Sequence, residues 1–450
     1  MNIKIDSRKV KKGDIFVALR TLNNDGHDYI EDAIKNGASK IIAEYGSYDI
    51  DYEIVNNTRE YLAAYLKENY YDLIKDIKLI GVTGTNGKTT SCFSLYQALN
   101  ILGIKSAYIG TIGFYMDEFV SKLNNTTPEL LDIYELLIEC KKNNVKVVVM
   151  EVSSHALSMN RVEGLLFDTA IFTNLTQDHL DYHKTLENYR KEKEKLFDMC
   201  KNAIINIDDD NSKYFIKDRN NNYTYGKNES DYIIKNIKLT ENGSSFSVKH
   251  KGKEVNYKTK LLGEYNIYNL LNVIIYLDTI GICDEVKVEV ISKINHPSGR
   301  MEIIDYKNNK IIIDYAHSPD AVNKIISSVK SFAKSRIITI VGCGGNRDRS
   351  KRPLMVREAL KSDYAILTSD NPRNENQSAI FEDMIYGVES DNFEIVYDRS
   401  EAIYKGIKML KDSDILLILG KGHEDYQIIG DKKYHFSDRE EVLKYILWYN

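Results

Sequence analysis

The sequence has few cysteines, no long apolar run and no excess of basic charge, and each of these absences excludes a class of protein. Its five cysteines are Cys92, Cys140, Cys200, Cys283 and Cys343, which lie far apart and form no C-x-x-C pair. Such spacing provides neither a disulfide framework nor the ligand pattern of a structural zinc site. We therefore expect free thiols and no structural zinc.

Membrane insertion, secretion and nucleic-acid binding are disfavoured on similar grounds. No apolar run is long enough to cross a bilayer, and the first residues, MNIKIDSRKVKKGD, lack the apolar stretch of a signal peptide. The formal net charge is −5, and the lysines and arginines are scattered along the chain. We expect a cytoplasmic, globular and monomeric protein that does not insert into membranes or bind nucleic acid.

Apolar, β-rich runs alternate with helical patterns along almost the whole chain of 450 residues. This alternation predicts an α/β fold in which helices cover parallel sheets. We expect three domains: a small N-terminal α/β domain (1–76), a central P-loop-type ATPase domain with a parallel sheet (77–296) and a C-terminal Rossmann-like domain (297–450).

Two local patterns refine this division. Between Asp231 and Gly263, alternation around TENGSS predicts an antiparallel hairpin added to the parallel sheet of the central domain. Further on, Pro297 and Gly299 in NHPSGRME interrupt the pattern. The last domain boundary is therefore placed there.

The stretch IGVTGTNGKTTS carries the clearest chemical signal, because an apolar strand breaks into glycines and resumes on a lysine and two threonines. A strict P-loop has glycine six residues before its lysine, and here that position is Val82. Gly84 and Gly87 nevertheless let backbone N–H groups approach an anion. Lys88 adds a positive charge, and Thr89 offers a hydroxyl to a metal ion at a helix N-terminus. We interpret the loop as a phosphate site, the alternative being a glycine-rich turn with a surface lysine.

A bound triphosphate needs metal ligands, and two later segments supply candidates. Glu151 ends the apolar strand in VKVVVMEVSSHAL, where a doubly wound sheet has its active crevice; alternatively, it caps the next helix. His179 and His183 lie four residues apart in FTNLTQDHLDYHKTLENYRKEKEKLF. On a continuous helix this spacing suggests zinc, whereas the nearby Asn174 and Asp178 favour oxygen-rich magnesium chemistry at least equally.

Ten segments in order carry a family resemblance: TGTNGKTT, NTTPE, MEVSSHAL, NLTQDHLDYH, GEYNIYN, GRME, IDYAHSPD, GCGGNRDRSKRPLM, TSDNPRNE and LGKGHEDYQ. Together they span nearly the whole chain, which resembles the ATP-dependent Mur ligases of peptidoglycan synthesis, and among them the enzymes that add the third amino acid. The resemblance implies that the three domains bind a UDP-sugar, ATP and the incoming amino acid, respectively. It also implies an amide ligase that joins meso-diaminopimelate to UDP-N-acetylmuramoyl-L-alanyl-D-glutamate through an acyl phosphate.

The resemblance also implies roles for individual residues around ATP and Mg²⁺. Lys88 is expected to stabilise the transferring phosphoryl group, and the implied magnesium ligands are Thr89, Glu151, His179 and a carbamylated Lys193. The alternative for Lys193 is a plain solvated charge run, since Lys191, Glu192, Glu194 and Lys195 surround it. The implied ATP contacts are Gly84, Thr85, Asn86, Gly87, Lys88, Thr89, Thr90, Asn266, Asn269, Arg300, Asp314 and His317. Asn266 could instead be a helix N-cap, and Arg300 could simply pair with a carboxylate.

The sugar-peptide is implied to contact Ser7, Asn125, Thr126, Thr127, Ser153 and Arg161. Two features differ from the family pattern. Met159 stands where glutamine is common, and the chain reaches Asp6-Ser7-Arg8 about a helix earlier than its relatives do.

The amino-acid pocket is implied to contain Arg347, Asp370, Asn371, Pro372, Arg373, Gly420 and Glu424. Arg373 follows Asn-Pro, as in family members that use meso-diaminopimelate, and a guanidinium can hold the second carboxylate of that amino acid with two hydrogen bonds. Glu424 is suited to bind an ammonium group. The alternative for Arg373 is an exposed turn in which its side chain points into water.

Three other functions stay open at this stage. The chain could be a Mur ligase that uses L-lysine or another amino acid, a related ligase with a different carboxylate substrate, such as a folylpolyglutamate synthetase, or a P-loop ATPase switch. DNPR and the recognisable first domain count against the folylpolyglutamate alternative. A switch would need neither a carboxylate nor an amine to turn over ATP.

Overall fold

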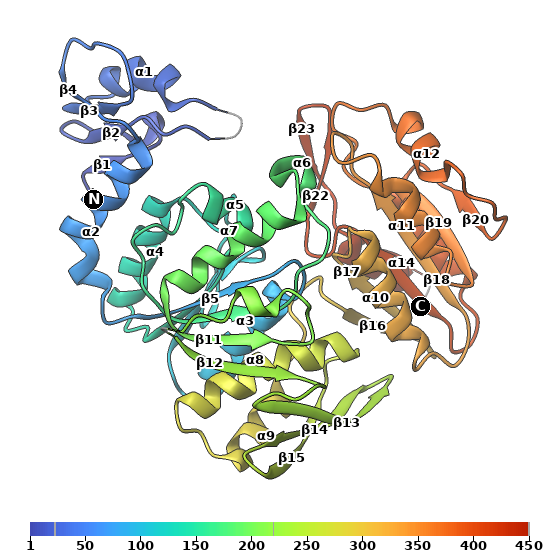
Figure 1. Cartoon of the computed structure of the whole chain (residues 1–450). Coiled ribbons are helices and arrows are strands. Elements are labelled where there is room, and N and C mark those ends of the chain that lie inside the picture. Colours follow the sequence, from blue (N-terminus) through green and yellow to red (C-terminus); the bar gives the residue numbers. More distant parts are fainter. Residues whose placement is uncertain (22–23, 219, 449–450) are drawn as a thin grey trace.

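The computed structural model describes residues 1–21, 24–218 and 220–448 and has an α/β architecture built on three main sheets (Figure 1). The predicted fold class is therefore confirmed. Within the described residues, no helix is both long and apolar enough to span a membrane. Cys92, Cys140, Cys283 and Cys343 are free thiols, of which only Cys283 is exposed.

The N-terminal part of the chain forms a four-stranded parallel sheet in the order β1-β2-β3-β4. Its helix α1 covers one face, and α2 packs against the other face and leads into the central sheet (Figure 1). The elements are β1 (Ile3–Lys4), β2 (Ile15–Val17), α1 (Ile30–Lys35), β3 (Lys40–Ala43), β4 (Asp51–Ile54) and α2 (Thr58–Ile74), with short 3-10 turns at Ser7–Lys9 and Gly26–Tyr29.

The central sheet has eleven strands in the order β15-β14-β13-β12-β11-β10-β5-β9-β6-β7-β8. It is parallel from β13 to β6 and carries antiparallel strands at both edges. The predicted hairpin is confirmed as β13, β14 and β15, whereas the pair β7 and β8 at the other edge was not predicted. The strands are β5 (Lys78–Thr83), β6 (Ser106–Gly110), β7 (Gly113–Met116), β8 (Glu118–Ser121), β9 (Val147–Glu151), β10 (Phe167–Phe172), β11 (Cys200–Asn206), β12 (Asn221–Gly226), β13 (Tyr232–Thr240), β14 (Gly243–His250) and β15 (Lys253–Thr259).

Helices cover both faces of this central sheet, because alternate strand residues point to opposite sides. On β5, Leu79 packs with α2, α4, α5 and α7, whereas Ile80 and Val82 pack with α3, α8 and α9. The helices are α3 (Lys88–Ile101), α4 (Leu130–Lys142), α5 (Ser154–Ser158), α6 (Leu180–His183), α7 (Leu186–Asp198), α8 (Glu264–Thr279) and α9 (Asp284–Lys293), with a 3-10 turn at Ser212–Tyr214.

The C-terminal sheet has six strands in the order β16-β17-β21-β18-β19-β20. All neighbours are parallel except β16 and β17, which form an antiparallel edge that was not predicted. Helices α10, α11 and α12 cover one face, and α13 and α14 cover the other. The elements are β16 (Glu302–Tyr306), β17 (Asn309–Asp314), α10 (Pro319–Lys330), β18 (Ile337–Cys343), α11 (Lys351–Ala359), β19 (Tyr364–Ser369), α12 (Gln377–Ile385), β20 (Phe393–Ile395), α13 (Arg399–Met409), β21 (Ile415–Leu419) and α14 (Asp438–Trp448), with a separate hairpin of β22 (Tyr426–Ile429) and β23 (Lys432–His435).

Candidate active site

The glycine-rich loop joins β5 to α3, and its conformation requires glycine at two positions. Gly84 has φ +148° and Gly87 has φ +86°, both in the region that side chains rarely adopt. A Cβ atom on Gly84 would lie 1.9 Å from Thr173 Oγ1, and one on Gly87 would lie 2.4 Å from Asn269 Oδ1. The loop therefore approaches its neighbours too closely to carry side chains there.

The segment after β10 holds this loop from the side. The backbone N–H of Thr85 donates to Asn174 O at 2.8 Å, and that of Asn86 donates to Asn174 Oδ1 at 3.0 Å. Thr173 Oγ1 in turn donates to Asn86 O at 2.6 Å. The glycine-rich loop is thus held in place by hydrogen bonds within the protein.

Lys88, the first residue of α3, is half-buried and folds back over the loop. Its Nζ atom donates to the carbonyl oxygens of Gly84 and Thr85, each at 2.9 Å. Burial lowers the pKa of Lys88, and the negative charges of Glu151 and Asp178 act in the opposite sense. The alternative of a surface lysine is therefore wrong.

Lys193 lies on α7 and is only 1% exposed. Its Nζ atom donates to Gly84 O at 2.8 Å and lies 4.4 Å from the centre of the Tyr189 ring. Burial, together with the charge of Lys88, holds the pKa of Lys193 well below its usual range. The solvated charge run is wrong for this residue, because the exposed lysines of the helix are Lys191 and Lys195.

Glu151 ends β9 and is 1% exposed. Its Oε1 atom accepts hydrogen bonds from Tyr108 OH at 2.5 Å and from the Thr111 backbone N–H at 2.9 Å, and its Oε2 atom accepts from Thr111 Oγ1 at 3.1 Å. The next helix, α5, is capped by Ser153 instead. The capping alternative for Glu151 is wrong, and its buried carboxylate, held by Tyr108 and Thr111, opposes the lowering of the Lys88 pKa by burial.

Three histidines lie close together after the carboxyl ends of β9 and β10, at the edge of the central sheet where β9 ends in Glu151. His179 has a left-handed backbone (φ +53°) just before α6, so it does not share a continuous helix with His183, as the zinc alternative requires. His183 Nε2 lies 3.0 Å from Ser154 Oγ, and His179 Nε2 lies 3.4 Å from Asp178 Oδ2. Burial lowers the pKa of His179 below its usual range and that of His183 to about 4, so both imidazoles are neutral at pH 7.

The third of these histidines, His155, was missed by sequence reasoning. Its ring centre lies 4.8 Å from that of His179 and 5.4 Å from that of His183. The signal was available, because His155 follows the end of β9 by only a few residues and so had to lie at the same edge. Across the described ranges, no group of three or more His, Cys, Asp or Glu side chains could hold a metal ion, so Glu151 and His179 need other donors to do so.

Asn266 and Asn269 lie within α8, which Gly263 precedes, so the N-cap alternative for Asn266 is wrong. Asn269 Nδ2 donates to Asn266 Oδ1 at 2.9 Å, and Asn269 Oδ1 accepts from Ser91 Oγ at 3.2 Å. These buried amides connect α8 to the start of α3, beside Gly87.

The C-terminal part of the chain reaches the loop through Arg300. Its Nη2 atom donates to Thr89 Oγ1 at 3.3 Å, and its guanidinium lies 4.4 Å from the centre of the Tyr315 ring. No ion pair to a carboxylate is found for Arg300 within the described residues, so the simple pairing alternative is wrong. Asn86 Nδ2 also donates to Asp320 Oδ2 at 2.9 Å, which gives a second contact across this junction.

Asp314, at the end of β17, is buried, and His317, three residues later, is half-buried. The carboxylate of Asp314 accepts from the backbone N–H groups of Met301 and Ala316, each at 2.8 Å. Burial raises the pKa of Asp314 and lowers that of His317. Asp314 therefore orders the chain around Arg300.

The predicted sugar-peptide residues fall in two places. Ser7 lies in the N-terminal 3-10 turn, and its carbonyl oxygen accepts from Asn36 Nδ2 at 2.9 Å. The other residues lie beside Glu151, where Thr127 Oγ1 donates to Glu151 O at 2.8 Å and accepts from the Ser153 N–H at 3.0 Å. Thr126 Oγ1 lies 3.1 Å from Thr111 Oγ1, and Asn125 is exposed.

Arg161 is largely committed to other protein groups. Its Nε atom lies 2.9 Å from Glu129 Oε1, and its Nη1 atom donates to Thr127 O at 3.2 Å. Glu129 also pairs with Arg59 of α2 at 2.8 Å. Met159 Sδ lies 3.6 Å from Arg161 Nη2 and so occupies part of this buried contact.

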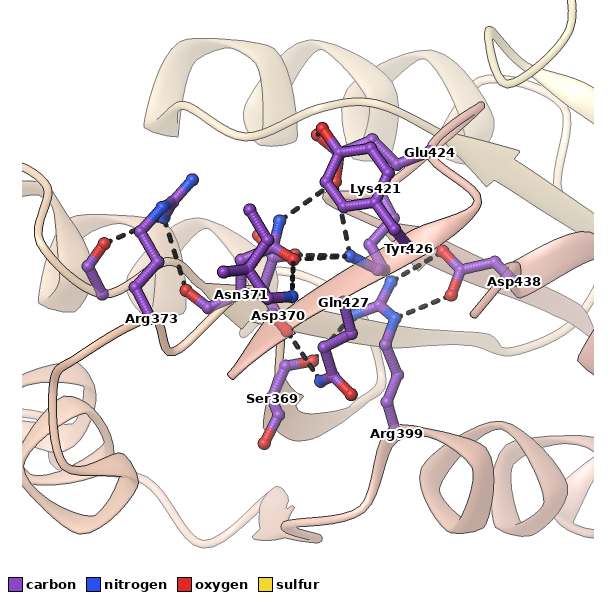
Figure 2. Close-up of polar contacts among 12 residues, drawn as sticks. Ser369, Asp370, Asn371, Arg373, Arg399, Lys421, Glu424, Tyr426, Gln427 and Asp438 are labelled. Carbon is purple, nitrogen blue, oxygen red and sulfur yellow. Dashed lines mark hydrogen bonds and ion pairs between the residues drawn. The ribbon is translucent and has the colours of Figure 1, made fainter. Parts of the chain in front are cut away.

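A cluster of polar side chains lies after the ends of β19 and β21, which flank β18 in the C-terminal sheet (Figure 2). Asn371 Nδ2 donates to Glu424 Oε2 at 3.0 Å, and Gln427 Nε2 donates to Asp370 O at 2.7 Å. Gly420 has φ +114°, and it turns the chain from β21 towards Glu424. Pro372 is buried, whereas Arg347 is exposed.

Arg373 is half-buried, and its backbone is left-handed with φ +52°. Its Nη1 atom donates to Gly345 O at 2.9 Å and to Asn371 O at 3.3 Å (Figure 2). Among the described residues, no carboxylate pairs with this guanidinium. The alternative of a side chain pointing freely into water is therefore wrong.

Comparisons with known proteins cover almost the whole chain. Three family descriptions match: "Mur ligase family, catalytic domain" over residues 1–73, "Mur ligase middle domain" over 82–277 and "Mur ligase, glutamate ligase domain" over 299–422. The UDP-N-acetylmuramoyl-L-alanyl-D-glutamate–2,6-diaminopimelate ligase of Clostridium tetani is 43% identical over 459 residues, covering 99% of this chain and 94% of that protein.

Solved structures agree with this similarity. A UDP-N-acetylmuramoyl-L-alanyl-D-glutamate–2,6-diaminopimelate ligase superposes with a TM-score of 0.70 at 32% identity, covering 99% of this chain and 94% of that one. The MurF ligase of Thermotoga maritima, solved in complex with ADP, gives a TM-score of 0.70 at 19% identity, with 99% and 96% coverage.

Proposed function

Because the chain belongs to the Mur ligase family, we propose that it joins meso-diaminopimelate to UDP-N-acetylmuramoyl-L-alanyl-D-glutamate at the expense of ATP, in peptidoglycan precursor synthesis. The proposal assigns the UDP-sugar to residues 1–76, ATP to 77–296 and the amino acid to 297–450. It also assigns the enzyme to the cytoplasm, as a monomer. The observation that carries it is the 43% identity over 99% of the chain to a ligase of that name.

At the ATP site, the loop supplies backbone N–H groups and Lys88 supplies positive charge. The first step brings a substrate carboxylate towards the γ-phosphate, so two anions approach each other. Positive charge that is fixed in advance lowers the barrier to this approach. Arg300, which already contacts Thr89 Oγ1, adds charge from the C-terminal side.

The residues at the loop also fit a magnesium ion. The candidate donors are the Thr89 hydroxyl, the buried carboxylate of Glu151 and the neutral imidazole of His179, a mostly oxygen set that leaves room for water ligands. When bound, Mg²⁺ would neutralise charge on the phosphates. A carbamate on Lys193 would add one more anionic oxygen ligand. Burial disfavours the charged form of Lys193. In its neutral form the amine can attack CO₂ with its lone pair, forming an N–C bond and releasing one proton.

In the second step, the amine of the incoming amino acid attacks the carbonyl carbon of the acyl phosphate, an amide bond forms and phosphate leaves. Water must be excluded, since it would hydrolyse the acyl phosphate. Contacts between the central and C-terminal parts of the chain, such as Asn86 with Asp320, support a closed site of this kind. Glu424 and Asp370 would bind ammonium, and Arg373 would bind the distal carboxylate.

The test is a ligase assay that follows ADP release and peptide product together. We expect ADP only when UDP-N-acetylmuramoyl-L-alanyl-D-glutamate and meso-diaminopimelate are both present, with one product formed per ADP. ADP release at full rate without either co-substrate would favour the P-loop switch instead. Turnover with a folate and glutamate, but not with the UDP-sugar peptide, would favour the folylpolyglutamate alternative.

A further inference from the structure

Lys421, between Gly420 and Gly422 after β21, has a fully buried side chain. Its Nζ atom lies 3.2 Å from Asp370 Oδ1, 3.3 Å from Asn371 Oδ1 and 3.3 Å from Glu424 Oε2 (Figure 2). The mechanism above does not use this ammonium group. It nevertheless contacts three side chains of the amino-acid pocket at once.

The carboxylates of Asp370 and Glu424 are both largely buried, and their negative charges repel each other. The side chains of Asp370 and Glu424 are only 13% and 14% exposed. Burial and the neighbouring charge of Asp370 raise the pKa of Glu424, whereas Lys421 and Asn371 act in the opposite sense. Two buried carboxylates without a cation between them would share a proton, and the protonated one would no longer attract an ammonium group.

Other titratable groups on neighbouring elements are close enough to interact electrostatically with one or both carboxylates: Tyr315 after β17, Cys343 on β18, Arg373 after β19, Arg399 on α13 and Tyr426 on β22. The phenols and the thiol are neutral at pH 7 because burial raises their pKa values. The two guanidiniums bond elsewhere, Arg373 to backbone carbonyls and Arg399 to Asp438. Among the residues that the structure describes, Lys421 is therefore the cation that pairs with both carboxylates.

We propose that Lys421 is a positioning residue that keeps Asp370 and Glu424 ionised and aligned, so that together they receive the ammonium group of the incoming amino acid. Two carboxylates and one lysine leave one net negative charge, which matches one ammonium. This proposal rests on the proposed function, since it assigns the pocket to the acceptor amino acid. It adds an electrostatic role for a buried side chain that does not itself touch the substrate.

The experiment compares Lys421→Met with Lys287→Met in the full-length enzyme. Lys287 is a matched control: it is 4% exposed and pairs with Asp278 at 2.5 Å and Asp284 at 2.9 Å, on a helix of the central part. At pH 7 we expect Lys421→Met to raise KM for meso-diaminopimelate by about tenfold or more, because a charge-dependent contact is weakened. KM for ATP and for the UDP-sugar peptide should change less than twofold, and Lys287→Met should leave all three values near wild type.

The pH profile separates positioning from general loss of structure. In Lys421→Met the carboxylate pair keeps a proton to higher pH, so the deficit in kcat/KM for the amino acid should shrink between pH 7 and pH 9. The free energy of unfolding of Lys421→Met should instead decrease over the same rise in pH. Burial and the charge of Asp370 raise the folded-state pKa of Glu424 above its unfolded value, so the stability that this group contributes is retained at low pH and lost as pH rises through the folded pKa. A deficit that is constant with pH, or shared equally by all three substrates, would overturn the proposal.

A second variant covers the case in which Lys421→Met does not fold. Lys421→Met combined with Glu424→Gln leaves a single carboxylate, which no longer has a like charge beside it. We expect this double variant to fold and to bind the amino acid more weakly than the wild type does. On the acidic side, its kcat/KM for the amino acid should depend on pH nearly as in the wild type. A pH dependence that stays shifted, as in Lys421→Met, contradicts the proposal. Failure of the proposed function is distinguishable, because then the wild type itself would form no product with meso-diaminopimelate.

Discussion

The Nζ atom of Lys193 lies 2.8 Å from the carbonyl oxygen of Gly84, although 109 positions separate the two residues in the chain. The contact brings a buried amine on α7 to the loop that joins β5 to α3. Burial and the neighbouring charge of Lys88 lower the pKa of this amine, so both disfavour a second cation beside Lys88. A carbamate there would turn the same position into a ligand for a metal ion.

The first prediction concerns this amine. Lys193→Ala should lower ligase turnover by about a hundredfold or more, because an anionic metal ligand is lost near the phosphates. Short-chain carboxylic acids should restore part of the activity by placing a carboxylate in the vacated space. The control is Lys195→Ala on the same helix, an exposed lysine paired with Glu192, which should keep wild-type turnover.

Two results would count against the carbamate. One is near-normal activity of Lys193→Ala that added acids do not change. The other is equal stimulation of Lys193→Ala and Lys195→Ala by the same acids, which would show a general effect of the acid.

The second prediction concerns Lys88. Its ammonium group is held against the loop by the carbonyl oxygens of Gly84 and Thr85. Lys88→Ala removes this fixed positive charge and should reduce ATP turnover by about a hundredfold, equal to about 2.7 kcal/mol of barrier. Lys78→Ala, an exposed lysine at the start of the preceding strand, serves as control and should not change turnover. Initial rates of ADP release at saturating substrates measure both. Wild-type turnover in Lys88→Ala would remove the loop lysine from catalysis.

The sequence predicted the α/β class, the antiparallel hairpin after Asp231 and the loop around Lys88, because these depend on local patterns: alternation, glycines and an apolar strand. It missed the antiparallel pair β16 and β17. That pair is formed by two similar isoleucine-containing runs, EIIDY and NKIIID, around a short polar turn, and periodicity alone does not give their direction.

The site residues divide in the same way. The sequence motif was enough to single out the residues of the glycine-rich loop as candidates. The burial of Lys421 and Arg399 could not be predicted, because a lysine in GKGHE and an arginine at the start of a helix are usually exposed. Their burial results from tertiary packing: Arg399 donates to Leu419 O at 3.0 Å and to Ser369 O at 3.3 Å, so it joins the ends of two strands that are distant in sequence. No local pattern carries this information.

The third prediction concerns the contribution of the buried ion pair between Arg399 and Asp438 to the free energy of unfolding. The side chains of Arg399 and Asp438 are both fully buried, and two hydrogen bonds of 2.7 and 2.8 Å join them (Figure 2). Asp438→Asn leaves the guanidinium without its counter-charge and should cost about 3–5 kcal/mol of unfolding free energy. Arg439→Gln, at the next position, removes an arginine that is 54% exposed and should cost less than about 1 kcal/mol. Urea unfolding followed by circular dichroism compares the two, and equal costs would contradict the assigned role of the buried pair.

The last prediction concerns the choice of amino acid. The guanidinium of Arg373 is held by Gly345 O and Asn371 O, beside Glu424 and Asp370, and has no carboxylate partner in the described part of the chain. A ligand with a distal carboxylate can supply one, and meso-diaminopimelate has this group whereas L-lysine does not. The wild type should therefore prefer meso-diaminopimelate, and Arg373→Ala should lose most of that preference, since a charged bidentate contact in a closed site contributes about 1.5–3 kcal/mol. The ratio of kcat/KM for the two amino acids measures it, with Arg357→Ala as a control, because that arginine is exposed and donates to Gly387 O at 3.2 Å. Equal use of both amino acids by the wild type, or an unchanged ratio in Arg373→Ala, would mean that Arg373 does not determine specificity.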